Sequence, residues 1–467
     1  MALRSAAAAC GAGLLVACGR STVAPTRSSE ITTVTLAADV GALQVYGTPQ
    51  VRAQLYTQVL RGFEQQHPGI RVQLAAWLPT GANQAAIVAG TAADVFPDFN
   101  SYYSYAQTGL LLPLDNYLRR DNIALSIWSP SITAFLALPT GTFALSRGID
   151  AHAWAVNLAA LDALGLAYPP QTWTHGHFAD LAHSLTVTKG GKTRFGVSFD
   201  SPLQGVAILQ EFLHGFGGSM VGPNLQTQTL GSPAALAAGR WWFEQFYRLD
   251  SAVIGGGPFG GTFAAMQEPD MNHVLNLYQT GWHNGKWTFY PPPVYPHGRS
   301  TTIDALFWGI SGTSRHPDAA WQLLKWLTTE TPWQRFLMKT FLFPPALVSL
   351  LTEWEATAVG TVPALARANL QAFSEVGRSP WALMTEVGFR YDSTRAVAAD
   401  DAIWAMIESG KVDVAEGFAA ADREVNALVS AAATEQPTSL AGQVKAHQAL
   451  QRDMRQMFAQ GRPGSGS

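Results

Sequence analysis

Apolar and polar positions follow two different periods along the first part of the chain. Residues 31–40 (ITTVTLAADV) and 70–74 (IRVQL) alternate as strands do. Between them, four apolar residues recur every four positions on one face of a predicted helix, namely Val51, Leu55, Val59 and Phe63. The sequence His67-Pro68-Gly69 ends that helix. This strand-helix-strand order predicts a parallel sheet with a right-handed crossover, the beginning of an α/β fold.

The stretch 89–114 repeats this pattern and adds polar side chains. ADVFPDF alternates as a strand, a polar and aromatic cluster follows it, and a small amphipathic helix ends at Gly109. The predicted strand thus delivers Asp98, Asn100 and Tyr102 to a loop. Ligands of open α/β sheets bind beyond the carboxyl ends of strands, so we interpret these as binding groups. The alternative is a βα loop with an Asn cap and with tyrosines that cover the sheet end.

The middle of the chain contains further residues that mark where predicted helices and strands begin and end. Residues 158–164 form a short Leu-rich segment before Gly165, and either Thr172 or Thr174 is placed to cap the next helix. Residues 195–199 are a strand candidate, residues 233–247 are predicted to form a helix, and the end of 397–428 (AEGFAAADREVNALV) is helix-like.

Composition sets the class of protein. A chain of 467 residues with 47% hydrophobic residues is long enough for more than one core. The net charge of -3 leaves no basic surface for nucleic acid, which excludes that class of partner.

The N-terminus predicts a compartment. Arg4 precedes an apolar run, residues 5–17, that is too short to span a bilayer, and Leu15-Val16-Ala17-Cys18 resembles a bacterial lipobox. We therefore expect residues 1–17 to be a signal peptide, Cys18 to be acylated, and residues 18–30 to be a flexible tether. The alternative is an ordinary secretory signal with a chance cysteine. The other cysteine is Cys10, so the mature chain is expected to contain no disulfide and no thiol nucleophile.

Enzyme signals are weak. Residues 255–260 formally satisfy GxGxxG, but no clear strand precedes them and Pro258 interrupts them. His175, His177 and His183 surround a helix start without a recognisable metal-ligand spacing, so we expect no metal and no cofactor. One pair of acidic residues could in principle make a glycosidase, either Asp39 with Asp98 or Asp150 with Asp304, and the separation of the carboxylates, which would decide it, does not follow from the sequence.

Several motifs together resemble a known family. They are the small-Gly-x-x-x-Asp-Val pattern of 89–95, YAQTGL at 105–110, FEQQHPGIRV at 63–72 and, most specifically, WAVNLAALDALGLAYPPQTWT at 154–174. These resemble the family 1 extracellular solute-binding proteins of ABC importers, of the maltose-binding and glycerol-phosphate-binding type. The glycine loop that leads to Phe263-Ala-Ala-Met266 is similar to the start of a helix in that family.

The resemblance implies a two-lobed α/β fold, the type II periplasmic-binding-protein fold, with a mainly parallel sheet flanked by helices in each lobe. It assigns residues 31–149 and 304–345 to lobe 1 and residues 150–303 and 346–430 to lobe 2, with crossings near 149, 304 and 346. Residues 431–467 form an extension without a counterpart.

The resemblance also implies a ligand site between the lobes. Its expected residues are Asp39, Asp98, Asn100, Tyr102, Asp150, Trp154, Trp282, Trp287, Asp304, Arg390 and Tyr391. Sugar-binding sites typically combine flat aromatic side chains with polar side chains around their edge. The 15 tryptophans of this chain could provide the aromatic surface. The loop DVGALQVYGTP departs from the sugar binders because it has no tryptophan.

The expected function is therefore capture of a carbohydrate outside the cytoplasm by a monomeric, membrane-anchored receptor that delivers it to an ABC permease and catalyses nothing. A non-sugar ligand, such as a glycerophosphodiester, a peptide or a metal chelate, stays open, because Arg147, Arg299 and Arg390 are too scattered in sequence to judge a phosphate site. A secreted glycosidase is the alternative from another class.

Overall fold

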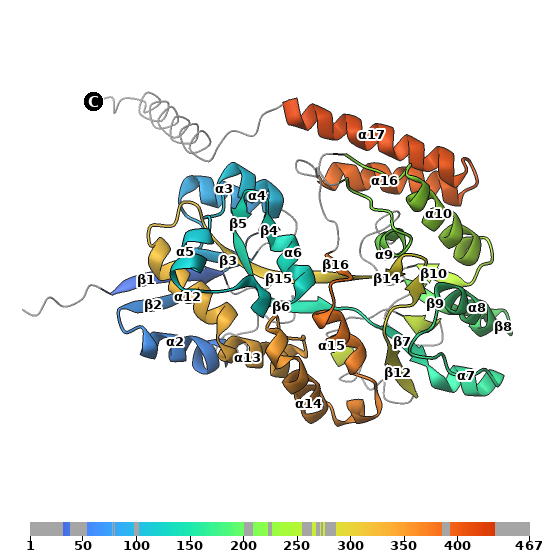
Figure 1. Cartoon of the computed structure of the whole chain (residues 1–467), viewed down its shortest axis with the longest axis horizontal. Helices are drawn as coiled ribbons and strands as arrows, with labels where there is room; N and C mark the ends of the chain where they lie inside the picture. The colour runs from blue at the N-terminus through green and yellow to red at the C-terminus, as the bar shows by residue number, and fades with distance from the viewer. Residues whose placement is uncertain are drawn as a thin grey trace, which may run out of the picture.

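The computed structural model describes residues 31–37, 54–76, 78, 80–97, 102–199, 209–222, 227–254, 264–267, 271, 274–275, 286–384 and 393–434. Within these residues the side chains form two separate hydrophobic cores, each built on its own sheet. Figure 1 shows the two lobes side by side, with β6 and β15 between them. The fold is the two-lobed α/β class that the sequence predicts.

The first sheet begins as the sequence predicts. β1 (Thr32–Ala37) pairs in parallel with β2 (Ile70–Ala75) and with β3 (Val95–Pro97). β15 (Thr301–Ile310) runs antiparallel to β3 and to β6 (Ala144–Ala151), and β16 (Ala382–Met384) joins β15 in parallel. The strand order is β16-β15-β3-β1-β2, with β6 also on β15. This sheet therefore mixes the early strands with strands from the far end of the chain.

Helices cover this sheet. They are α2 (Arg61–Gln66), α3 (Thr80–Ala89), α4 (Tyr102–Thr108), α5 (Asp115–Arg120), α6 (Pro130–Leu136), α12 (Pro317–Thr329), α13 (Thr331–Phe341), α14 (Leu351–Thr361) and α15 (Gln371–Arg378). Short 3-10 turns lie at Leu125–Ile127, Val348–Leu350 and Pro363–Arg367, and β4 (Ala137–Leu138) pairs with β5 (Gly141–Thr142). A π-helical turn, Tyr56–Leu60, precedes α2. Leu55, Val59 and Phe63 are buried, which confirms three positions of the predicted apolar stripe, and the fourth, Val51, lies outside the described residues. Gly109 follows α4 at φ 78°.

The second sheet has the order β10-β9-β11-β7-β12. Its strands are β7 (Trp154–Asn157), β9 (Lys192–Phe199), β10 (Ala252–Ile254), β11 (Ala264–Gln267) and β12 (Trp287–Tyr290), with β8 (Val187–Lys189) against β9. A separate pair is β13 (Val294–Tyr295) with β14 (Gly298–Arg299). β9, β10 and β11 are parallel, whereas β7 and β12 are antiparallel to their neighbours.

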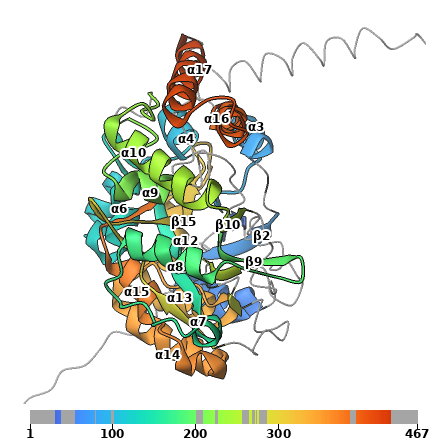
Figure 2. The same ribbon diagram turned by 90° about the vertical axis from the view of Figure 1, so that its right-hand side faces the viewer.

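The helices of the second lobe are α7 (Leu158–Leu164), α8 (His175–Leu185), α9 (Gln210–Gly215), α10 (Pro233–Trp242) with the π turn Phe243–Tyr247, α16 (Ser393–Glu408) and α17 (Val414–Thr434). Figure 2 shows α10, α9, α8 and α7 following one another along this lobe, with α16 and α17 at one end.

Two local predictions in this lobe are resolved. Gly165 ends α7 in the left-handed region at φ 64°, which a residue without a Cβ adopts at no steric cost. Thr174, not Thr172, caps α8, because its side chain accepts a hydrogen bond from the backbone N–H of His177.

The helix expected at 263–266 is wrong. Residues Ala264–Gln267 form β11, which lies between β9 and β7 and hydrogen-bonds to both. Hydrogen-bonding partners on both sides of the strand outweigh the helical preference of Ala-Ala-Met, because local propensity yields to tertiary context.

The boundary expected near 346 is also wrong. Buried residues between Ala346 and Val376 belong to the first core, and β16 extends the first sheet. The reason is the apolar face of α14 and α15, where Trp354 and Phe373 pack with the helices of the first core. Only α16 and α17 return to the second core, so the third crossing lies between β16 and α16.

Candidate functional site

The two strands that connect the lobes bring two predicted site residues together. In the antiparallel register of β6 and β15, Asp150 lies directly opposite Asp304. Residues opposite one another in such a ladder have Cβ atoms about 4.5–5.5 Å apart and share one face of the sheet. Asp150 is half-buried, and its Oδ1 is shielded from water. The sequence placed both residues at lobe crossings, and the register makes them neighbours.

A buried arginine precedes this pair on β6. The register of β6 against β15 shifts between Leu306 and Phe307, which leaves Arg147 as the extra residue of a β-bulge. Arg147 is fully buried, and its guanidinium carbon lies 5.1 Å from the ring centroid of Trp308. Burial lowers its pKa to about 9, so the side chain still carries its charge at neutral pH. A cation on an indole face is a favourable arrangement.

Helix α13 holds the bulge in place. The indole N–H of Trp333 donates to the carbonyl oxygen of Arg147 at 2.7 Å, and the amide of Gln334 donates to the same oxygen at 3.3 Å. The other end of that amide accepts from the backbone N–H of Ala346 at 2.9 Å. Gly148 follows the bulge, and a Cβ there would lie 2.3 Å from Leu337 of α13. The backbone leading to Asp150 is therefore fixed by packing against one helix.

Two predicted site residues lie in the cores. Tyr102 is buried, and its hydroxyl donates to the carbonyl of Leu136 at 2.6 Å. Trp154 is buried among Phe178 and Phe199 of the second core. In this structure neither ring presents a surface to a ligand. The resemblance placed Trp154 at the ligand site, but β7 is covered on both faces, with Ala155 in the first core and Trp154 in the second.

Trp287 lies away from the aspartate pair. It begins β12 opposite Asn157, at the far end of β7 from Trp154, and its half-buried ring packs against the first core. The other expected contacts, Asp39, Asp98, Asn100, Trp282, Arg390 and Tyr391, lie outside the described residues, as do Cys18 and the glycine loop 255–260.

The three histidines near α8 serve different local contacts. His175 Nδ1 lies 3.3 Å from the carbonyl of Val294, and His183 Nε2 lies 2.7 Å from the carbonyl of Gln245. The backbone of His177 contributes to the helix cap. Among the described residues no group of three His, Cys, Asp or Glu side chains is arranged to hold a metal ion.

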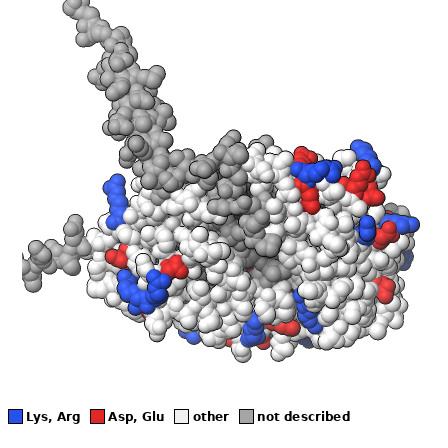
Figure 3. All heavy atoms as spheres, turned by 45° about the horizontal axis from the view of Figure 1, so that its top comes forward, with Lys and Arg blue, Asp and Glu red and all other residues white. Residues whose placement is uncertain are grey.

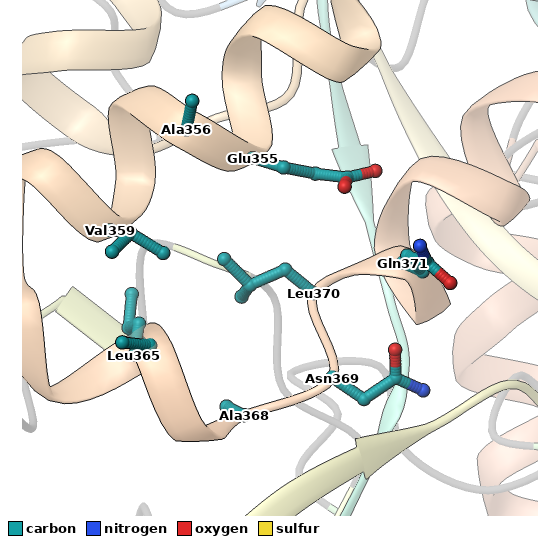
Figure 4. Close-up of a pocket in the computed structure, with 9 residues that line it drawn as sticks. Glu355, Ala356, Val359, Leu365, Ala368, Asn369, Leu370 and Gln371 are labelled. Atoms are coloured by element: carbon teal, nitrogen blue, oxygen red, sulfur yellow. The ribbon is translucent and has the colours of Figure 1, made fainter.

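Sequence reasoning missed a hollow on the first lobe. It has a volume of about 550 Å³ and is lined mainly by residues of α14 and the segment 365–371. Figure 4 shows Val359, Leu365 and Leu370 around its centre, with the amide of Asn369 turned away from them. No motif marks this segment in the sequence.

Asn369, at the edge of this hollow, connects the two lobes. Its side-chain amide donates to Gln171 Oε1 and to the carbonyl of Phe289, each at 3.1 Å, and its backbone N–H donates to Thr288 Oγ1 at 3.1 Å. Phe289 in turn packs edge-on against Phe373 of α15 with ring centroids 4.9 Å apart. The second sheet is thus joined to α15 at a point distinct from the strands β6 and β15.

The surface has few charges. Only 13% of residues are charged, and Figure 3 shows them in a few separate groups on a largely uncharged face. Within the described part of the chain, no helix combines the length and the apolarity that a membrane span requires.

Comparison with known proteins gives one family and a consistent set of structures. The family model described as bacterial extracellular solute-binding protein matches residues 47–332. The chain is similar in structure to the sugar-binding protein MalE from Xanthomonas citri, with 18% identity, coverage of 85% of this chain and 98% of that chain, and a TM-score of 0.68.

Two further structures give similar values. The cyclic alpha-maltosyl-1,6-maltose binding protein from Arthrobacter globiformis is 16% identical, with 85% and 98% coverage and a TM-score of 0.66. UspC from M. tuberculosis is 19% identical, with 85% and 99% coverage and a TM-score of 0.65. At these identities the likeness establishes the fold.

Proposed function

Because the chain belongs to the family of bacterial extracellular solute-binding proteins, we propose that it captures a carbohydrate between its two lobes and delivers it to an ABC permease. The observation that carries the proposal is the position of Asp150 opposite Asp304, on the two strands that join the lobes. A ligand that contacts this pair lies where both lobes are within reach.

The chemistry of the pair suits a polyhydroxylated ligand. Ionised carboxylates accept several hydrogen bonds and donate none, and sugar hydroxyls are donors that meet this demand. The expected contacts outside the described residues, Asp39, Asp98, Asn100, Trp282, Arg390 and Tyr391, would complete the site with further acceptors and with aromatic surface. We assign Tyr102, Trp154 and Trp287 to packing, because their rings lie in or against the cores.

The described arginines give a phosphorylated ligand little support. Arg147 is fully buried below Trp308. Arg299 donates to the carbonyls of Pro292 and Gln171, each at 2.7 Å. A phosphate-binding site typically has several arginine N–H donors that point at the same phosphate group. Arg147 and Arg299, two of the three arginines considered from the sequence, thus contact other parts of the protein.

Binding would work through the relative population of two lobe arrangements. A ligand that contacts both lobes favours the arrangement in which both sets of contacts form at once. The closed form would dock on the permease, and acylation of Cys18 would keep the protein at the outer side of the membrane. No chemical step is required of this chain.

A thermal-shift screen of residues 19–467 tests the proposal. Its panel contains mono- and oligosaccharides, polyols, glycerophosphodiesters and short peptides. A ligand at 100 times its dissociation constant adds about 2.7 kcal/mol to the folded state. A rise in melting temperature confined to sugars supports the proposal, whereas a rise confined to phosphodiesters or peptides changes the ligand class.

Chromogenic glycosides provide the control for catalysis. Binding without release of the chromophore is expected. Turnover that disappears in Asp150→Asn or Asp304→Asn would contradict the receptor assignment and support a glycosidase.

A further inference from the structure

A group of acidic and amide side chains lies between the loop 219–231 and the two last helices of the second lobe. In the described residues of this loop, Gly222 donates its N–H to the carbonyl of Thr227 and Thr229 donates its N–H to the carbonyl of Met220, on either side of an antiparallel bridge between Val221 and Gln228. Helices α16 and α17 pack against one another beside this loop (Figure 2). None of these residues belongs to the site proposed above.

Helix α17 holds the loop through its backbone. Asn426 Oδ1 accepts from the N–H of Gln228 at 2.7 Å, and Asn426 Nδ2 donates to the carbonyl of Gln228 at 3.2 Å. One turn earlier, Asp422 accepts from the N–H groups of Leu230 at 2.9 Å and Gly231 at 2.7 Å. These contacts order the backbone of residues 228–231.

Helix α16 reaches the same loop through one buried carboxyl. Asp400 is 1% exposed and Gln228 is 3% exposed, and Gln228 Nε2 donates to Asp400 Oδ1 at 2.7 Å. Among the described residues, neither Asp400 Oδ2 nor the oxygen Oε1 of Gln228 has a hydrogen-bond partner. A buried acceptor without a donor costs free energy, and a buried negative charge costs more.

The charges around Asp400 increase this cost. The charged groups that act on it are Asp422 and Glu424 from α17 and Asp401 from its own helix, and all of them are carboxylates. Among the described residues that act on it, the hydrogen bond from Gln228 is the contact that favours the ionised form. Burial is the largest cause that raises the pKa of Asp400, to about 7. Protonation removes the charge and gives Oδ2 a hydrogen to donate.

We propose that α16 is docked on loop residues 228–231 by a protonated Asp400, and that this clasp loosens when the proton leaves. The clasp secures the first described element after the third crossing between the lobes. The second lobe then holds helix α16 most firmly near pH 4 and progressively less firmly as the pH rises to about 7. The pair Asp400 and Gln228 is the titrating contact.

Hydrogen exchange of the Gln228 amide against pH tests the clasp in the full mature chain. This amide donates to Asn426, which does not titrate, so its protection reports the docking of the loop. After correction for intrinsic exchange, the opening constant is expected to rise with pH by up to about tenfold per unit between pH 3.8 and about 7, and to level off above pH 7. In Asp400→Asn the profile is expected to be much shallower, because the side chain stays neutral and the neighbouring Asp401 and Asp422, whose pKa values burial also raises, still titrate.

Two controls separate protonation from general effects. Asp401→Asn removes a neighbouring charge but not the hydrogen bond to the loop, so its profile is expected to keep its slope. A flat wild-type profile, or an Asp400→Asn profile as steep as the wild type, would overturn the proposal, and the wild-type measurement stands even if the variant folds poorly. Loss of the pH dependence on adding calcium would also overturn it, since the cluster would then be a cation site.

Discussion

Asp150 and Asp304 lie directly opposite one another on the two antiparallel strands that join the lobes. The two residues are more than 150 positions apart in sequence, and each follows a different crossing of the chain. The strand register alone makes them a pair.

The first prediction concerns this pair. Asp150→Asn and Asp304→Asn each replace a charged acceptor by a neutral group of the same shape. We expect each to weaken binding of the sugar found in the thermal-shift screen by roughly ten- to a hundredfold, because hydrogen bonds to charged groups contribute about 1.5–3 kcal/mol. Stability should stay unchanged or rise slightly, since like charges opposite one another destabilise a sheet. Isothermal titration calorimetry measures the affinity.

Asp162→Asn is the matched control for that experiment. Asp162 is a surface aspartate that pairs with Lys286 at 2.9 Å in the second lobe. The affinity of Asp162→Asn for the same sugar is expected to equal that of the wild type. If both pair variants behave like this control, the aspartate pair is not part of the ligand site.

The second prediction concerns the bulge at Arg147. Trp333→Phe removes the indole N–H that donates to the Arg147 carbonyl. Trp326→Phe makes the same change of size at a buried indole whose N–H has no partner among the described residues. We expect the first variant to be less stable than the second by about 1 kcal/mol, the net contribution of one hydrogen bond. Urea unfolding measures both, and equal losses would mean that the hydrogen bond does not stabilise the bulge.

The third prediction concerns packing in the second lobe. A Cβ at Gly196 of β9 would lie 1.8 Å from the backbone carbonyl oxygen of Ala182 in α8, so Gly196→Ala forces the helix off the sheet. Such overpacking costs about 1–3 kcal/mol or more. At Gly176, in the first turn of α8, the nearest atom to such a Cβ is Thr174 Oγ1 at 3.9 Å, so Gly176→Ala should be neutral or stabilise by about 0.4–1 kcal/mol. Melting temperatures that fall equally in the two variants would contradict the close approach of α8 to β9.

The fourth prediction concerns pH and global stability. The folded-state pKa of Asp400 is raised to about 7 from 3.8, so its contribution to stability is fully present below pH 3.8 and is lost as pH rises to about 7. This difference corresponds to roughly 4 kcal/mol. Asp400→Asn should therefore match the wild type near pH 4 and exceed it in unfolding free energy by up to that amount at pH 8. Urea unfolding at the two pH values measures the difference, and a constant offset would show that Asp400 does not titrate between them.

Local patterns predicted the elements best where a single residue type forces the backbone. Gly109 and Gly165 end their helices at positive φ, and Thr174 caps the helix that follows the proline-rich turn. Alternation likewise located β1 and β2, because one face of each is buried. These signals depend on neighbours within a few residues.

The candidate site was less accessible to such reasoning. The resemblance placed Trp154 at the ligand site, but its strand is covered on both sides and the ring belongs to the second core. Arg147 was known only as one scattered arginine until the bulge placed it over Trp308. Burial depends on what packs against a strand, and sequence spacing does not contain that information.

The sequence by itself determined the local elements, the α/β class and the resemblance that led to the family, because these follow from periodicity, from capping residues and from contiguous motifs. The tertiary structure decided which distant residues meet. It placed Asp150 opposite Asp304, assigned α14 and α15 to the first core, and put Asp400 of α16 against Gln228 of an earlier loop. Strand register and helix packing fix these pairs, and both depend on the whole fold rather than on neighbours in the chain.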